Sequence, residues 1–316
     1  MTIGDTPRVG VSSCLLGEEV RYDGGHKRND YVSNTLADHL DLVPWCPEMA
    51  IGLGVPRPPI RLIRRADEIR AVRTDDTSVD VTDKLAAYGR EVSNTLGDLS
   101  GYILKKDSPS CGMERVRVYN GSTPDKSGTG IYARVIMEAH PHLPTEEEGR
   151  LNDPRLRENF IERVFTLHRW QKMVQQGLTP RSLVAFHTEH KFLILAHDEP
   201  GYRELGRLIS QAGGEKVESL GKRYLTLLMQ TLSHHATPKK HANVLMHIMG
   251  FFKDKLDASD KAELLEQIDA HREGLVPVIV PITLINHYLR KFPETYIERQ
   301  IYLSPHPREL MLRNHV

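Results

Sequence analysis

The stretch Val9-Gly10-Val11-Ser12-Ser13-Cys14-Leu15-Leu16-Gly17 decides the fold of the first half of the chain. A β-branched run enters it and small or polar residues close it, which predicts a buried strand that stops at a thiol. Residues 42–48 and 101–112 follow the same plan, and they end in loops that carry Cys46 and Cys111. Ligands of parallel α/β sheets bind beyond the carboxyl ends of the strands. The pattern therefore predicts three thiols at one edge of a sheet.

Helical segments separate these strands and define the fold class. Apolar spacing predicts helices over 30–40, with Asp30 as the N-cap, and over 81–96, with Thr82 as the cap. Strand–helix–strand units of this size imply parallel, right-handed pairing. We therefore expect residues 1–150 to form an α/β, Rossmann-like domain with a mostly parallel sheet and cysteines at the strand ends. The remaining expectations are a loop at 51–59, strands at 68–73 and 116–119, a loop at 120–130, a helix at 131–139 and a linker at 140–153.

The second half of the chain reads as helical almost throughout. The predicted helices are Arg155–Gln175, Pro180–Ala196, Pro200–Ala212, Val217–His234, Pro238–Phe252, Ser259–Glu273 and Ile279–Lys291. Three of them begin at a proline, which favours the first turn of a helix. We therefore expect residues 151–316 to form an all-α domain.

Composition indicates an ordinary globular protein with an uneven charge distribution. The 42 basic and 42 acidic side chains balance, but residues 1–153 hold 19 basic and 24 acidic ones, while residues 154–316 hold 23 and 18. No apolar run reaches the length of about 18 residues typical of a membrane span, and residues 1–7 lack the pattern of a secretory signal. Three cysteines do not pair completely, so we expect a reducing, cytoplasmic location and no membrane association.

The cysteine spacing leaves three kinds of chemistry open. The absence of a Cys-x-x-Cys pair excludes zinc-ribbon and thioredoxin motifs. A single catalytic thiol with His26 as its base uses one cysteine and leaves two idle. Alternatively, all three are small buried hydrophobes. Three thiolates without a fourth also suit an iron–sulfur cluster with one iron left open, and such an iron is a Lewis acid that favours sulfur ligands.

Three separate segments resemble the signature of the TudS-type thiouracil desulfidases. They are residues 12–24, residues 46–48 and residues 108–112, in the family's order, within a similarity that spans about residues 7–140. The resemblance implies that Cys14, Cys46 and Cys111 hold a 4Fe–4S cluster whose open iron binds a thiocarbonyl sulfur, which water then replaces without net electron transfer.

The same resemblance implies roles for polar residues around the cysteines. Glu48 matches a carboxylate that handles protons, and Ser108 matches a serine that contacts the substrate; a first-turn carboxylate and a turn serine are the structural alternatives. The remaining substrate-binding candidates of the α/β domain are Ser12, Ser13, Arg21, Asp23, Lys105 and Ser110.

The helical half offers a basic patch. Lys239, Lys240, His241 and Lys253 suit phosphate contacts on RNA, although a solvated helical surface explains them equally. This half resembles the helical domain fused behind TudS domains in RudS-type enzymes, which implies removal of sulfur from 4-thiouridine in tRNA. The sequence leaves two alternatives open: a desulfidase of free thiouracil or thiouridine monophosphate, and a non-enzymatic iron–sulfur regulator that binds nucleic acid. No obligatory protein partner is expected.

Overall fold

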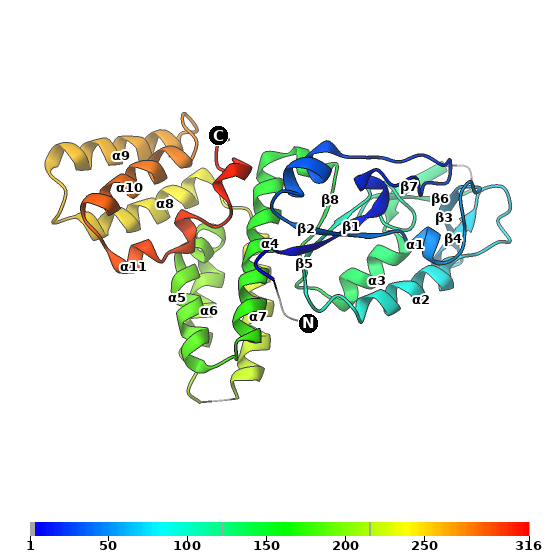
Figure 1. The fold of residues 1–316 in the computed structure, drawn as a ribbon, viewed down its shortest axis with the longest axis horizontal. Helices are drawn as coiled ribbons and strands as arrows, with labels where there is room; N and C mark the ends of the chain where they lie inside the picture. The colour runs from blue at the N-terminus through cyan, green and yellow to red at the C-terminus, as the bar shows by residue number, and fades with distance from the viewer. Residues whose placement is uncertain (1–3, 122, 215, 316) are drawn as a thin grey trace. The chain divides into compact units, whose positions relative to one another are not determined.

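The chain divides between Asp153 and Pro154 into two compact units. The computed structural model describes residues 4–121, 123–214 and 216–315. The first unit combines sheets and helices, and the second is helical, so the expected order of an α/β domain and an all-α domain is confirmed (Figure 1). The division falls three residues after the end of the expected first domain, residue 150.

The central sheet of the first unit is entirely parallel. Its strands are β1 (Arg8–Ser12), β2 (Asp41–Trp45), β5 (Leu99–Leu104) and β8 (Thr145–Glu147), in the order β2-β1-β5-β8. Every residue of β5 is buried, as a strand covered on both faces requires. Because the strands are parallel, their carboxyl ends meet at one edge of the sheet. The expected Rossmann-like arrangement is thereby confirmed.

Short and long helices connect these strands. They are a 3₁₀ turn at Ser13–Leu16, a π-helix at Tyr31–Leu36, α1 (Pro47–Ala50), α2 (Thr82–Ser93), α3 (Ile131–Ala139) and a 3₁₀ turn at Arg150–Asn152. Helices α2 and α3 pack against each other (Figure 1). Asp30 occupies the expected N-cap position, but its side chain makes no capping hydrogen bond. The expected cap at Thr82 is wrong, because Thr82 is the first residue of α2 and its hydroxyl accepts the backbone N–H of Ala71 at 2.7 Å.

A second, mixed sheet was largely missing from the sequence expectations. It has the order β4-β3-β6-β7 and consists of β3 (Ile60–Arg65), β4 (Glu68–Arg73), β6 (Val116–Asn120) and β7 (Thr123–Gly128). The expected strands at 68–73 and 116–119 are confirmed. The expected loop at 120–130 is wrong, because β7 pairs antiparallel with β6. The expected linker at 140–153 is also wrong, because β8 pairs with β5.

The second unit consists of helices, and apart from the last short one they follow the predicted helices within a few residues. They are α4 (Pro154–Gln175), α5 (Pro180–His197), α6 (Glu199–Ile209), α7 (Val217–Ser233), α8 (Pro238–Met249), α9 (Ala258–Arg272), α10 (Ile279–Lys291) and α11 (Thr295–Glu298), with 3₁₀ turns at Gly250–Phe252, Ile301–Leu303 and Arg308–Leu310. Side chains of Thr179, Asp198 and Thr237 cap α5, α6 and α8. Within the described ranges, no helix combines the length and apolar character needed to cross a bilayer.

The loop that carries Cys111 is fixed by its contact with the start of α3. The backbone N–H groups of Ile131 and Ala133 donate to the carbonyls of Pro109 and Ser110, at 3.0 and 3.1 Å. A Cβ atom on Gly130 would lie 2.5 Å from the Ser110 carbonyl oxygen and 2.8 Å from the Cys111 nitrogen. Only glycine therefore allows this close approach of the two backbones.

Gly130→Ala is expected to lower the free energy of unfolding by about 1–3 kcal/mol, because backbone atoms must move to admit the methyl group. Urea denaturation followed by circular dichroism measures this change. Gly97→Ala is the matched control, since nothing lies within 4 Å of a Cβ atom there. Equal stability of the two variants would contradict the close packing of the loop on α3.

Candidate metal centre and its polar wall

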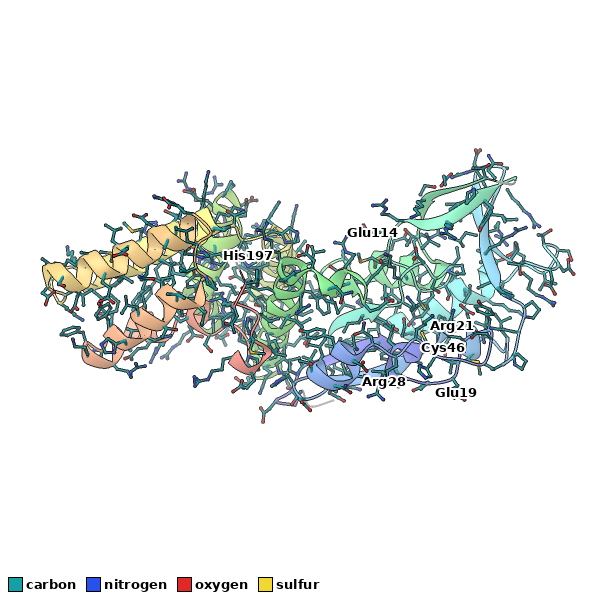
Figure 2. The ribbon with its side chains drawn as sticks, turned by 90° about the horizontal axis from the view of Figure 1, so that it is seen from above. Glu19, Arg21, Arg28, Cys46, Glu114 and His197 are labelled. Atoms are coloured by element: carbon teal, nitrogen blue, oxygen red, sulfur yellow. The ribbon has the colours of Figure 1, made fainter. Side chains whose placement is uncertain are left out.

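The three cysteines line one cavity of about 410 Å³ at the carboxyl edge of the parallel sheet. Cys14 follows β1, Cys46 follows β2, and Cys111 lies in the loop after β5. All three are free thiols, and Cys14 and Cys111 are buried. Figure 2 labels Cys46 and Arg21, which belong to the same cavity wall. The structure therefore brings together the three thiols that the strand pattern predicts.

Burial and mutual repulsion oppose the thiolate form of these cysteines. Burial raises the pKa of Cys14 to about 11, although the positive charge of Lys105 works in the opposite direction. Burial also raises the pKa of Cys46, and burial together with the charge of Cys46 raises that of Cys111. A bound cation reverses this balance, because a coordinating thiol is deprotonated outright. Three sulfur donors on one cavity wall therefore fit a soft metal centre, and Cys14, Cys46 and Cys111 fit a cluster held by three cysteines.

A chain of hydrogen bonds leads from the cavity wall to Glu48. The Ser110 hydroxyl donates to Glu48 Oε1 at 2.7 Å, and the hydroxyls of Ser108 and Ser110 lie 2.9 Å apart. Ser108 Oγ also accepts the backbone N–H groups of Ser110 and Cys111. Ser108 therefore holds the turn, as its position before proline indicates, and also reaches the carboxylate through Ser110.

Arg57 is a site residue that the sequence analysis missed. Its guanidinium donates to Glu48 Oε2 through Nε at 3.1 Å and through Nη2 at 2.7 Å. It also donates to the carbonyls of Gly54 and Val20. The Arg57 side chain is 5% exposed and that of Glu48 is 15% exposed. Arg57 belongs to a loop of glycines and prolines with other arginines nearby, so no motif distinguishes it.

Most of the other predicted residues line the cavity. Ser12, Ser13, Arg21, Lys105 and Ser110 all do so. Ser12 Oγ accepts the backbone N–H of Lys105 at 3.0 Å, which ties the ends of β1 and β5 together. The Lys105 ammonium forms an ion pair with Glu148, so its charge is already partly compensated.

Asp23 is a correction, because it does not belong to the cavity wall. Its carboxylate accepts the backbone N–H of Gly25 at 3.1 Å and pairs with Arg21 at 3.2 Å. These local bonds hold the loop that carries Arg21. Asp23 therefore positions that loop and does not face the cavity.

The basic patch of the helical unit is also rearranged. His241 is buried, and its Nδ1 lies 3.0 Å from the Tyr302 hydroxyl, so its expected contact with RNA is wrong. Lys253 is exposed and lines neither of the two hollows described below. Lys239 and Lys240 line an open hollow of about 800 Å³, where Lys240 donates to the carbonyls of His197 and His235.

This hollow combines cations with aromatic side chains. A neighbouring hollow of about 550 Å³ shares Lys191, Tyr202, Arg203 and Tyr296 with it. We call the two together the basic groove; Phe251 and Lys239 line its first part and Arg207 its second. Burial lowers the pKa of Lys191, but the neighbouring hydroxyls of Tyr202 and Tyr296 raise it by more. The pKa of Lys191 is therefore raised overall. The groove therefore offers charge and ring faces together.

Comparisons with known proteins match both units. Residues 9–148 match the family model described as 2-thiouracil desulfurase, and residues 191–307 match DUF1722, a family of unknown function. The uncharacterized protein YbgA of Escherichia coli K12 is 32% identical over 165 residues, 52% of this chain and 98% of YbgA. The uncharacterized protein YbbK of Bacillus subtilis 168 is 34% identical over 156 residues, 45% of this chain and 97% of YbbK. A solved structure of the 4Fe–4S-dependent thiouracil desulfidase TudS shares 28% identity over 47% of this chain and 95% of its own, with a TM-score of 0.37.

Fold and site define a class of protein in which a parallel sheet presents three cysteines at one edge and a helical unit follows. The chain belongs to the family that joins a TudS-type 2-thiouracil desulfurase domain to a DUF1722 helical region. The resemblance identified from the cysteine segments is thereby confirmed.

Arg57→Met is expected to lower the free energy of unfolding by about 3 kcal/mol, because it leaves the Glu48 carboxylate without its cation. In a Glu48→Gln background the same replacement should cost at least about 1 kcal/mol less. Urea denaturation of the four proteins of this cycle measures the coupling.

Arg73→Met provides the comparison for an exposed pair. The charged groups of Arg73 and Asp75 lie 2.5 Å apart, and their side chains are 32% and 49% exposed. Loss of this ion pair should therefore lower the free energy of unfolding by less than about 1 kcal/mol. Equal costs of Arg57→Met in the two backgrounds would show that Arg57 and Glu48 are not coupled.

Proposed function

We propose that this protein is an iron–sulfur-dependent desulfidase that converts 4-thiouridine in tRNA to uridine and hydrosulfide. One observation carries the proposal: three free cysteines line one cavity together with Glu48, which Arg57 and Ser110 hold in place. The match of residues 9–148 to the 2-thiouracil desulfurase model supports a thiocarbonyl on a pyrimidine as the group that reacts.

The cysteines would hold the cofactor, and the serines around them would support it. Cys14, Cys46 and Cys111 provide three thiolates for a 4Fe–4S cluster. When bound, such a cluster supplies a Lewis-acidic iron with affinity for sulfur. Burial raises the pKa of Cys14 and of Cys111, and the charges of Lys105 and Arg21 on Cys14 and the Ser12 hydrogen bond to Cys111 offset only part of that rise, so the bound cluster itself would have to stabilise the thiolates.

Glu48 is suited to handle the protons of the reaction. Replacement of C=S by C=O consumes one water: its oxygen bonds to carbon, the C–S bond breaks, and sulfur leaves at the oxidation level of sulfide, so no electron is transferred. The carboxylate accepts a proton from the attacking water and returns it to the leaving group or ring nitrogen. Arg57 fixes one oxygen of Glu48, while Ser110 and Ser108 lead from the other toward the cavity.

The basic groove supports RNA as the carrier of the thiolated base. Lys191, Lys239 and Arg207 suit phosphate oxygens, whose neutralisation dominates the affinity of nucleic-acid binding. Tyr202, Tyr296 and Phe251 suit stacking with unpaired bases, which RNA-binding proteins commonly use. A free thiouracil needs no such surface.

Glu48→Gln is expected to lower the rate of sulfide release from thiolated tRNA by about 10²–10⁴-fold, the usual contribution of a general base. Its iron and acid-labile sulfide content should equal that of the unaltered protein after anaerobic reconstitution. Cys14→Ser, Cys46→Ser and Cys111→Ser should each lower both cluster content and activity. Loss of the near-ultraviolet absorbance of 4-thiouridine follows the reaction.

Glu19→Gln serves as the control, because Glu19 is an exposed carboxylate outside the cavity wall. Full activity of Glu48→Gln would exclude Glu48 as the base. Binding of nucleic acid that requires the cluster, without any turnover, would favour the regulator over the enzyme.

A double replacement in the basic groove, Lys239→Glu with Arg207→Glu, is expected to weaken binding of tRNA. It should also reduce the slope of log affinity against log salt by roughly one for each lost phosphate contact. Turnover of free 4-thiouridine monophosphate should not change, because the cavity is unaltered. Filter binding over a salt series and single-turnover assays measure the two effects.

Lys261→Glu, on α9 and outside the groove, is the matched charge reversal. If Lys261→Glu and the double replacement in the groove weaken tRNA binding equally, the RNA contacts lie outside the groove. Turnover of the free nucleotide without turnover of tRNA would identify the protein as a small-molecule desulfidase.

A further inference from the structure

Two glutamates and a histidine of the helical unit converge away from the basic groove. Glu158 and Glu162 lie one turn apart on α4, and His306 comes from the segment between the last two 3₁₀ turns. One carboxylate oxygen of each glutamate and one ring nitrogen of His306 all lie within 4.8 Å of one another. The sequence analysis gave these residues no role.

The free nitrogen of His306 is the decisive feature of this cluster. The His306 Nδ1 lies 3.1 Å from the carbonyl oxygen of Pro307, so it donates its proton there and leaves a lone pair on Nε2. The Nε2 atom is buried without a hydrogen-bond partner, and the whole residue is only 8% exposed. A metal-binding histidine has the same arrangement, since its other nitrogen donates to a carbonyl or carboxylate.

Cations already surround the two carboxylates but do not reach His306 Nε2. Arg313 donates to Glu162 Oε1 at 2.8 Å and to Glu158 Oε1 at 3.2 Å. His197 bonds Glu162 through Nε2 at 3.0 Å and the His234 carbonyl through Nδ1, so it has no nitrogen left for a metal. Burial and the charge of Glu162 raise the pKa of Glu158. Each carboxylate oxygen retains a further lone pair, and His306 Nε2 has one as well.

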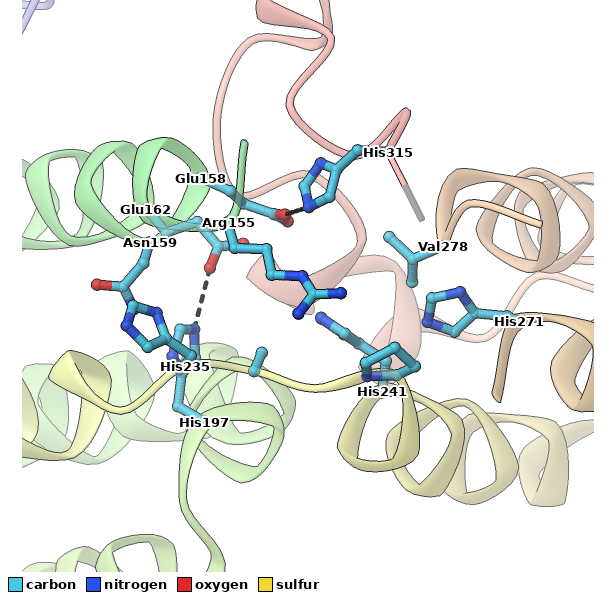
Figure 3. A pocket seen from close by; sticks show the side chains of 12 residues that line it. Arg155, Glu158, Asn159, Glu162, His197, His235, His241, His271, Val278 and His315 are labelled. Carbon is cyan, nitrogen blue, oxygen red and sulfur yellow. Dashed lines mark hydrogen bonds and ion pairs between the residues drawn. The ribbon is translucent and has the colours of Figure 1, made fainter. Parts of the chain in front are cut away.

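A small cavity of about 40 Å³ adjoins the carboxylates (Figure 3). Its wall includes Glu158, Glu162, His197, His271 and His315, and the figure marks the bonds of Glu158 to His315 and of Glu162 to His197. This volume accommodates about one water molecule. His306 is not part of this wall, so the cavity adjoins the two carboxylates only.

We propose that Glu158, Glu162 and His306 bind a divalent transition-metal cation. Imidazole and carboxylate ligands suit zinc, iron and manganese, whereas the thiol cavity suits a soft iron–sulfur centre. Ligands on opposite sides of such an ion lie at most about 4.2 Å apart, so a closing movement of side chains below about 1 Å completes the site. The ion would join α4 to the C-terminal segment and thereby stabilise the helical unit.

Cobalt(II) is the probe, because its visible absorption reports protein ligands. The full chain with Cys14, Cys46 and Cys111 replaced by serine removes the competing thiols, and circular dichroism verifies its fold. We expect one Co²⁺ per chain, displaced by Zn²⁺, and an affinity lower by about tenfold or more in His306→Gln. Glu158→Gln, which preserves volume, should weaken binding to a similar extent.

His187→Gln is the matched control, because His187 is also a buried histidine of this unit but lies outside the cluster. Equal Co²⁺ binding by His306→Gln and the parent chain, or no saturable binding, would overturn the proposal. Should the serine chain fail to fold, anomalous scattering from Zn²⁺-soaked crystals of the unaltered chain decides between the same outcomes. The test is independent of desulfidase activity.

Discussion

Three thiols share one buried cavity, and the rest of the first unit depends on this constraint. Burial alone keeps Cys14, Cys46 and Cys111 protonated, whereas a cationic centre requires them as thiolates. The parallel sheet brings two of them to one edge directly, and the contact between Gly130 and the Ser110–Cys111 backbone places the third. The fold therefore forms the sulfur set, and the free energy of binding a metal centre there would offset the cost of ionising it.

The carboxylate of Glu48, beside the three cysteines, is held from two sides. Arg57 occupies Glu48 Oε2 with two N–H groups, and Ser110 occupies Oε1 with its hydroxyl. A guanidinium is always charged, so Arg57 gives the Glu48 carboxylate a permanent counter-charge. The hydroxyls of Ser108 and Ser110 then connect the Oε1 side of the carboxylate to the cavity. Fixed charge on one side and a chain of exchangeable protons on the other suit a group that takes up and returns one proton.

Strong local patterns predicted the sulfur set and most helices, while long-range pairing remained hidden. The run before Cys14 is β-branched and buried almost throughout, as in a strand covered on both faces, and the prolines that begin α5 and α8 mark helix starts. Strand β8 has the sequence Thr-Glu-Glu, whose acidic side chains disguise its pairing with β5. Strand β7 is polar and almost fully exposed, so it lacks apolar alternation. No local pattern marks the contact of Arg57 with Glu48 or that of His306 with two glutamates of α4, and His241 faces a tyrosine 61 residues away.

The helical unit contains two groups of charged side chains, one accessible to water and one buried. In the basic groove, Lys191, Arg203 and Lys239 remain accessible, so they can exchange water and salt ions for phosphate oxygens. Around Glu162 the charges are almost completely buried, and their neighbours are fixed by backbone carbonyls. Ion pairs of this kind resist exchange, because removal of one partner leaves a buried charge unpaired. The accessible cations are therefore suited to a partner that binds and dissociates, and the buried cluster is suited to a constituent that stays with the folded chain.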